Sequence, residues 1–131
     1  MKTRDADTAG KNVIKSPIHY QNIQEITELY LGGEETPLSV VQHFLERIDS
    51  LDSGYLSYAT VVADQALEQA GILSKELRDG QIRGPLHGIP VAVKDLCYTT
   101  GVKTMGGTAV LEENIPDYDS TVVSRLKAEG R

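Results

Sequence analysis

The chain has 131 residues, with 13 Lys and Arg against 19 Asp and Glu, so its formal net charge is −6. This length supports one ordinary hydrophobic core, and 40% hydrophobic with 24% charged residues is typical of a soluble globular protein. An acidic balance without a basic stripe argues against nucleic acid and anionic membrane surfaces as partners. The single cysteine, Cys97, excludes an internal disulfide and is typical of a reducing compartment, so we predict a cytoplasmic protein.

The first residues, 1–16, mix charges with small polar side chains and show little periodicity. We predict a flexible leader there and one domain over residues 17–131. The leader lacks the apolar core of a signal peptide, and no apolar run in the sequence approaches the length of a membrane span. No membrane partner is therefore expected.

Two helices are predicted next. Apolar residues recur at helical spacing over residues 23–31, and Gly32-Gly33 ends that helix. Thr36 as N-cap and Pro37 at the first helical position begin a second helix. The core-facing stripe of the second helix contains Val41, Phe44, Leu45, Ile48 and Leu51.

Strands and a third helix are predicted in the middle of the chain. Tyr55–Val62 is rich in residues that favour strands. Asp64 can cap a helix from Gln65 to about Arg78. Val91–Val93 is apolar on both faces, as in a strand that is covered on both sides. Helices that alternate with strands in this way indicate an α/β protein.

Two further helices are predicted near the end. A Gly-Gly turn within Met105-Gly106-Gly107-Thr108 precedes a short helix at Ala109–Glu112. Asp119 or Ser120 caps the last helix, and Gly130 stops it. The inward face of this last helix contains Val122, Val123 and Leu126.

The segment from Arg83 to Leu96 organises the chain. Gly84-Pro85 and Gly88 are turn residues, and the strand that follows them ends at Lys94. Lys94 has two interpretations. It can be a strand-end lysine with its ammonium in water, paired with Asp95. Alternatively it can be desolvated, since burial favours the neutral amine, which takes a proton from a hydroxyl nucleophile.

Other chemistry is weakly supported. Residues 101–108 nearly match a phosphate-binding loop, but Gly107 stands where the lysine is needed. Cys97 and His87 could form a thiol–base pair, although they lie ten positions apart, and a buried filler is the simpler role for Cys97. We assign His43 a structural or surface role. The histidines and carboxylates lack metal-ligand spacing, so we expect no metal and no cofactor.

The segment Gly84-Pro85-Leu86-His87-Gly88-Ile89-Pro90-Val91-Ala92-Val93-Lys94-Asp95 resembles the lysine segment of the amidase signature family. The continuation through Thr100-Gly101-Val102, Met105-Gly106-Gly107-Thr108 and residues 119–130 resembles the family in order and spacing. Residues 23–80 resemble its helical N-terminal region only loosely.

The resemblance implies a large fold with a mixed sheet flanked by helices, and hydrolysis of amide C–N bonds by a Ser–cis-Ser–Lys triad. Lys94 then matches the triad lysine, and the loop Met105, Gly106, Gly107 and Thr108 lies beside the substrate pocket. The Gly/Ser-rich motif that carries both serines in the family does not occur in these 131 residues. We therefore expect residues 17–131 to be the N-terminal segment of one amidase domain, truncated before that motif.

Several functions remain open at this point. The main hypothesis is the N-terminal part of a serine amidase that acts on a small amide substrate, inactive as this chain alone. One alternative is the corresponding part of an amidotransferase subunit, which feeds ammonia to a tRNA-linked substrate. A catalytically silent interaction module is another. Since a strand buried on both faces lacks its partners here, self-association is also expected.

Overall fold

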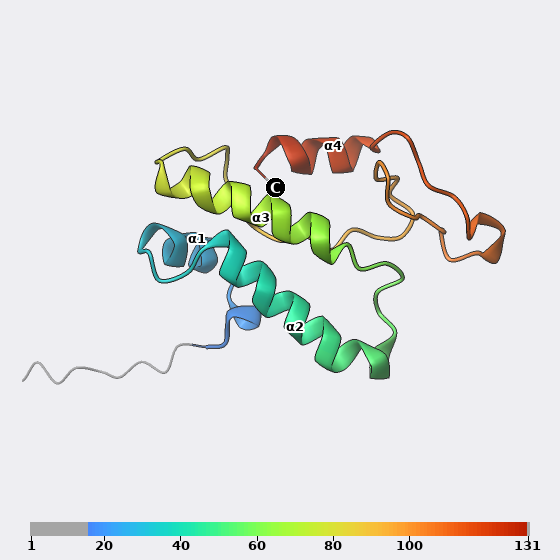
Figure 1. The fold of residues 1–131 in the computed structure, drawn as a ribbon, viewed down its shortest axis with the longest axis horizontal. Coiled ribbons are helices and arrows are strands. Elements are labelled where there is room, and N and C mark those ends of the chain that lie inside the picture. Colours follow the sequence, from blue (N-terminus) through green and yellow to red (C-terminus); the bar gives the residue numbers. More distant parts are fainter. Residues whose placement is uncertain (1–15, 131) are drawn as a thin grey trace, which may run out of the picture.

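A computed structural model describes residues 16–130, so the predicted leader lies outside the described residues except for Ser16. The elements that it contains are helical: η1 (Ile18–Tyr20), α1 (Ile23–Leu31), α2 (Pro37–Tyr55), α3 (Ala63–Arg78), η2 (Ala109–Leu111) and α4 (Thr121–Ala128). The two long helices α2 and α3 pack side by side, and the connection between α3 and α4 carries the loop around η2 out to one side (Figure 1). No helix within residues 16–130 is long and apolar enough to cross a membrane.

Reciprocal caps fix where the first two α-helices begin. In α1, the Glu25 N–H donates to the Asn22 side chain, and the Glu25 carboxylate accepts from the Asn22 N–H. In α2, the same exchange joins Thr36 to Ser39, with Pro37 at the first helical position. The predicted cap and start of α2 are therefore confirmed.

The hydrophobic core lies where α1, α2 and the segment after α3 meet. Its buried members are Ile26, Tyr30, Val40 and Ile89, and Phe44 packs against them. The predicted stripe of α2 enters this core only in its first half. Val41 is buried, whereas the Leu51 side chain at the far end of the helix is 40% exposed.

The first predicted strand, Tyr55–Val62, is wrong. Tyr55 is the last residue of α2, and Leu56 closes the helix in the left-handed region with φ 52°. The Asp52 carboxylate then accepts hydrogen bonds from the N–H groups of Ser57 and Tyr58, at 2.8 and 3.3 Å. These bonds to a side chain engage backbone donors that a strand would offer to a neighbour, so local capping overrides the β-propensity.

The second predicted strand, Val91–Val93, is also wrong for the described part of the chain, where the segment is irregular and Ala92 is exposed. A strand exists only when another segment pairs with its backbone. Between residues 16 and 130, the isolated bridge between Thr99 and Val102 is the only β pairing. The mixed sheet that we predicted is therefore not formed by these residues, which make a helical unit.

The last helix forms where it was predicted, but its cap differs. Ser120 is the N-cap residue of α4, yet its side chain makes no capping bond. The Asp119 carboxylate instead accepts from the Thr100 N–H at 2.8 Å and from the Lys127 ammonium at 2.6 Å. Asp119 thus ties α4 to the loop that follows Lys94.

Candidate active site

The turn that precedes Lys94 is fastened to several helices at once. The buried Tyr30 hydroxyl donates to the Gly88 carbonyl at 2.9 Å, which joins the turn to α1. The Gly88 N–H donates to the Gly130 carbonyl at 2.9 Å, and the Leu86 N–H donates to the Glu129 carbonyl at 3.2 Å, just after α4. The backbone that leads to Lys94 is therefore held from two sides.

Two glycines of this turn are required by close packing. Gly88 has φ +74°, and a Cβ there would lie 2.4 Å from the Cγ of Pro37. A Cβ on Gly84 would lie 2.6 Å from the Glu129 carbonyl oxygen. The turn can approach α2 and the end of α4 only because these positions lack side chains.

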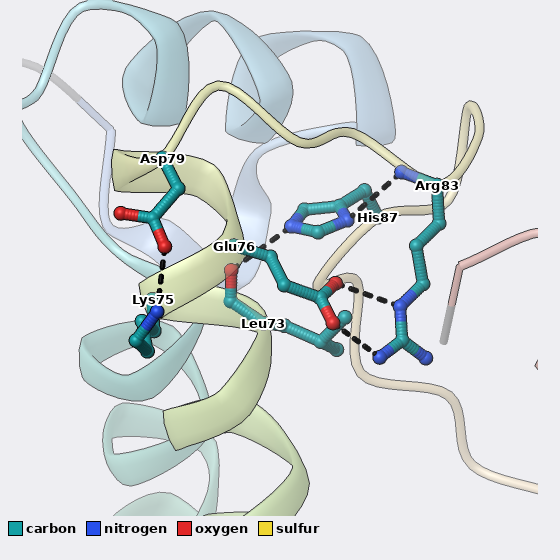
Figure 2. Close-up of polar contacts among 6 residues, drawn as sticks. All are labelled: Leu73, Lys75, Glu76, Asp79, Arg83 and His87. Atoms are coloured by element: carbon teal, nitrogen blue, oxygen red, sulfur yellow. Dashed lines mark hydrogen bonds and ion pairs between the residues drawn. The ribbon is translucent and has the colours of Figure 1, made fainter.

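His87 fastens the same turn to α3. Figure 2 shows its imidazole between the carbonyl of Leu73, 3.0 Å from Nε2, and the Arg83 N–H, 3.3 Å from Nδ1. Since Nδ1 accepts from an N–H group, the proton belongs on Nε2, which donates to Leu73. Both ring nitrogens are thus occupied by backbone groups, which argues against the pairing of His87 with Cys97 as a base.

Next to His87, the Arg83 guanidinium forms a two-bond contact with the Glu76 carboxylate, at 2.6 and 2.7 Å (Figure 2). Hydrogen bonding by Arg83 holds the pKa of the Glu76 carboxyl below its ordinary value. This contact joins α3 to the start of the turn, so its role is to position the turn.

The Lys94 side chain is exposed at the end of the fastened segment. Its carbonyl accepts from the N–H groups of Leu96 and Cys97, at 2.7 and 2.9 Å, so the chain turns immediately after it. The ammonium has no hydrogen-bond or ion-pair partner among residues 16–130, and the pairing with Asp95 that we considered is not formed.

Asp95 holds the Gly-Gly loop instead. Its carboxylate accepts from the Met105 N–H at 2.8 Å, and its carbonyl accepts from the Gly106 N–H at 2.7 Å. The structure thus brings the residue after Lys94 into direct contact with the predicted pocket loop. Sequence reasoning considered Asp95 only as a partner of Lys94 and missed this role, which an acceptor side chain beside a turn could have suggested.

The Gly-Gly loop has the conformation that its sequence requires. Gly106 and Gly107 have φ of 60° and 74°, in the left-handed region. Thr108 accepts from the Val110 N–H at 3.3 Å and so caps η2, a 3-10 helix that covers most of the predicted short helix. The N–H groups of Met105 and Gly106 are already bound to Asp95, which argues further against a phosphate-binding loop.

A second brace holds the start of the loop. The buried Thr104 donates its N–H to the Asn114 carbonyl at 3.0 Å, and the Asn114 side-chain amide donates to the Thr104 carbonyl at 2.9 Å. Sequence reasoning gave Asn114 no role. Within the described residues, no group of three or more His, Cys, Asp and Glu side chains could hold a metal ion.

Residues 39–131 match the sequence model of the amidase family. That match covers more than half of the chain, and the chain therefore belongs to the amidase family. A glutamyl-tRNA(Gln) amidotransferase subunit of Thioalkalivibrio sulfidiphilus is 42% identical over 113 residues, which are 86% of this chain and 23% of the relative. A putative amidase AmiD of Mycobacterium tuberculosis is 37% identical over 127 residues, 96% of this chain and 27% of the relative.

The fold also resembles that of solved amidase signature enzymes. A bacterial aryl acylamidase of the amidase signature family superposes with a TM-score of 0.79 at 26% sequence identity, over 88% of this chain and 24% of that enzyme. The chain thus spans about a quarter of the length of the relatives that it matches. The helical unit described above corresponds to a part of a larger fold.

Proposed function

We propose that this chain is the N-terminal portion of a serine amidase and that Lys94 is the lysine of its Ser–cis-Ser–Lys triad. The observation that supports this most is the state of Lys94. Its backbone is fixed by the turn, while its ammonium is exposed and has no partner within residues 16–130. A base must keep its nitrogen available to a reacting group, and Lys94 meets this requirement among the described residues.

In the proposed reaction, the Lys94 amine accepts the proton of the bridging serine. That serine takes the proton of the nucleophilic serine, whose oxygen attacks the amide carbon. The tetrahedral oxyanion is stabilised by N–H donors, the C–N bond breaks, the amine leaves with the proton, and water hydrolyses the ester. The loop Met105–Thr108 forms a wall of the pocket, and the hydrogen bonds of Asp95 hold this loop close to Lys94.

The test begins with the coding sequence beyond Arg131, which should encode a Gly/Ser-rich motif. In the full polypeptide, Lys94→Ala should reduce kcat for amide hydrolysis about 10⁴-fold, because triad members act as a unit. Lys75→Ala is the matched control, since Lys75 is an exposed lysine on α3 that pairs with Asp79. Equal activity of the two variants would refute the assignment of Lys94.

A second candidate function is supported by one comparison. The relative from Thioalkalivibrio sulfidiphilus is described as one subunit of a glutamyl-tRNA(Gln) amidotransferase. Such a protein works with partner subunits, whereas a free amidase does not need them. Co-purification of the full polypeptide with partner subunits and glutamine-dependent ammonia release would favour the amidotransferase. Hydrolysis of simple amides by the polypeptide alone would favour the amidase.

A further inference from the structure

Two histidines meet far from Lys94, where η1 lies against α2. Nδ1 of His19 on η1 is 3.1 Å from Nε2 of His43 on α2. The two rings are within 9° of parallel, and their centres are 5.4 Å apart. That separation is close to the N···N distance plus one ring radius at each end. The two nitrogens therefore point at each other nearly in line, as in an N–H···N hydrogen bond.

This geometry suits a shared proton and excludes a shared metal. A zinc ion needs about 2.0–2.1 Å to each imidazole nitrogen, with the two lone pairs converging on it. On a straight line of 3.1 Å, the midpoint is too close to both nitrogens for any such ion. A hydrogen bond instead needs one nitrogen to donate and the other to accept, so the pair must keep one acceptor.

Apart from the imidazole contact, few interactions join η1 to the rest of the fold. Ile18 packs against the core cluster, and the hydrogen bonds of the turn from Pro17 to Gln21 are local. A groove of about 360 Å³ lies between η1 and the second half of α2. Its lining includes His19, Tyr20, Phe44, Arg47, Leu51 and Tyr55. Loss of the imidazole bond would therefore open this groove.

The charges around the pair oppose extra protons. From α2, His43 and the Arg47 guanidinium act on His19, and burial removes water from its ring. Burial first, then Arg47 and His43, lower the pKa of His19 from its ordinary value of 6.5. Of the acidic groups at the groove, the Asp52 carboxylate is bound to the N–H groups of Ser57 and Tyr58, and the rest are phenols of Tyr20, Tyr55 and Tyr58.

We propose that His19 and His43 form a proton-controlled latch that holds η1 on α2 and opens when both imidazoles are protonated. The pair can take up one proton and keep its bond, because an imidazolium donates to a neutral imidazole. A second proton leaves two donors and two positive charges beside Arg47. Since docking lowers proton affinity at His19, docking is favoured above the ordinary histidine range and weakens as the pH falls through it.

The test is an NMR titration of the chain from about pH 8 to about pH 5, which follows imidazole ¹⁵N signals and amide protection at Tyr20 and Gln21. We expect two coupled protonation steps at the pair, and a fall in amide protection of at least about tenfold with the second. His87, with both nitrogens bound to backbone groups, is the internal reference.

Three variants make the test specific. In His43→Gln the amide side chain still donates and accepts but does not titrate, so η1 should remain docked to lower pH. In Arg47→Gln the second proton binds more easily, so release should move to higher pH. Arg78→Gln removes the same charge from a residue that does not act on His19, and it should leave the curve unchanged.

Three results would overturn the latch. The amides of residues 18–21 could keep their protection over the whole pH range. His43→Gln could follow the same release curve as the unmodified chain. Zn²⁺ at neutral pH could shift both imidazole signals together, which would mean that the nitrogens converge on a metal instead of pointing at each other.

Discussion

Gly88 is the position where a single methyl group should damage the fold most. A Cβ there meets Pro37 at 2.4 and 2.8 Å, and both partners are held in place. Pro37 is fully buried as the first residue of α2, and the Gly88 carbonyl accepts from Tyr30 while its N–H donates to Gly130. Gly88→Ala must therefore displace either the start of α2 or the turn that carries Lys94.

The expected cost has two parts. A left-handed φ of +74° costs an L-residue about 1–2 kcal/mol. Forcing a methyl into packed side chains costs about 1–3 kcal/mol more. Gly80→Ala isolates the first part, because Gly80 has the same φ of +74° and nothing within 4 Å of its Cβ. We expect Gly88→Ala to lower the free energy of unfolding by about 2–5 kcal/mol, and Gly80→Ala by about 1–2 kcal/mol.

The assay is urea unfolding followed by far-ultraviolet circular dichroism, at concentrations low enough to suppress association. With a slope of about 1–3 kcal/mol per molar urea, the clash should separate the two variants by about 1 M in midpoint. Equal midpoints for Gly88→Ala and Gly80→Ala would refute the reasoning, because the close approach to Pro37 would then contribute nothing.

Three further predictions concern groups outside that contact. Burial, with a smaller effect of Glu35, raises the pKa of the Tyr30 phenol above its ordinary value of 10.0. The contribution of the neutral phenol to the stability of the fold is therefore present below that value and lost at higher pH. In an absorbance titration, one of the six tyrosines should ionise only when the chain unfolds. Tyr30→Phe should remove that step and lower the free energy of unfolding by about 1–2 kcal/mol. A Tyr30→Phe curve that retains the late step would contradict this. The purified 131-residue chain should hydrolyse amides no faster than its Lys94→Ala variant, and a measurable difference would show that the chain supplies its own nucleophile. Sedimentation should show association that grows with concentration, whereas a strict monomer would contradict the exposure of apolar side chains at Leu96, Val110, Ile115, Tyr118 and Val122.

The helices were predictable because their signals are local. The start of α2 depends on Thr36, Pro37 and Ser39, which are neighbours in the sequence, and its core stripe follows from the period of the helix. The strands were not predictable in the same way, because pairing depends on segments elsewhere. Tyr55–Val62 has the composition of a strand, yet Asp52 captures two of its N–H groups as a helix ends.

The candidate site shows the same division. The sequence predicts Lys94 as a candidate base from its place after a turn and an apolar run, and from the family resemblance. The contacts that position Lys94 could not be predicted, since Tyr30 and Gly130 lie far from Gly88 in sequence and meet it only in the folded chain. The sequence suggests Asp95 as a partner of Lys94, whereas in the structure its carboxylate accepts from the Met105 N–H.

His87 and Lys94 differ in burial and in hydrogen bonding, although both belong to the same segment. Both are basic residues within seven positions of each other, yet His87 is buried and has both nitrogens bound to backbone groups. Its contacts, with those of Gly88, hold the backbone of the turn in place, and both of its ring nitrogens are engaged by backbone groups. Lys94 follows that fixed backbone. Its neighbour Asp95 accepts from the Met105 and Gly106 N–H groups of the Gly-Gly loop. Among residues 16–130 the Lys94 nitrogen has no hydrogen-bond or ion-pair partner, and the proposed role as a general base requires such an available nitrogen.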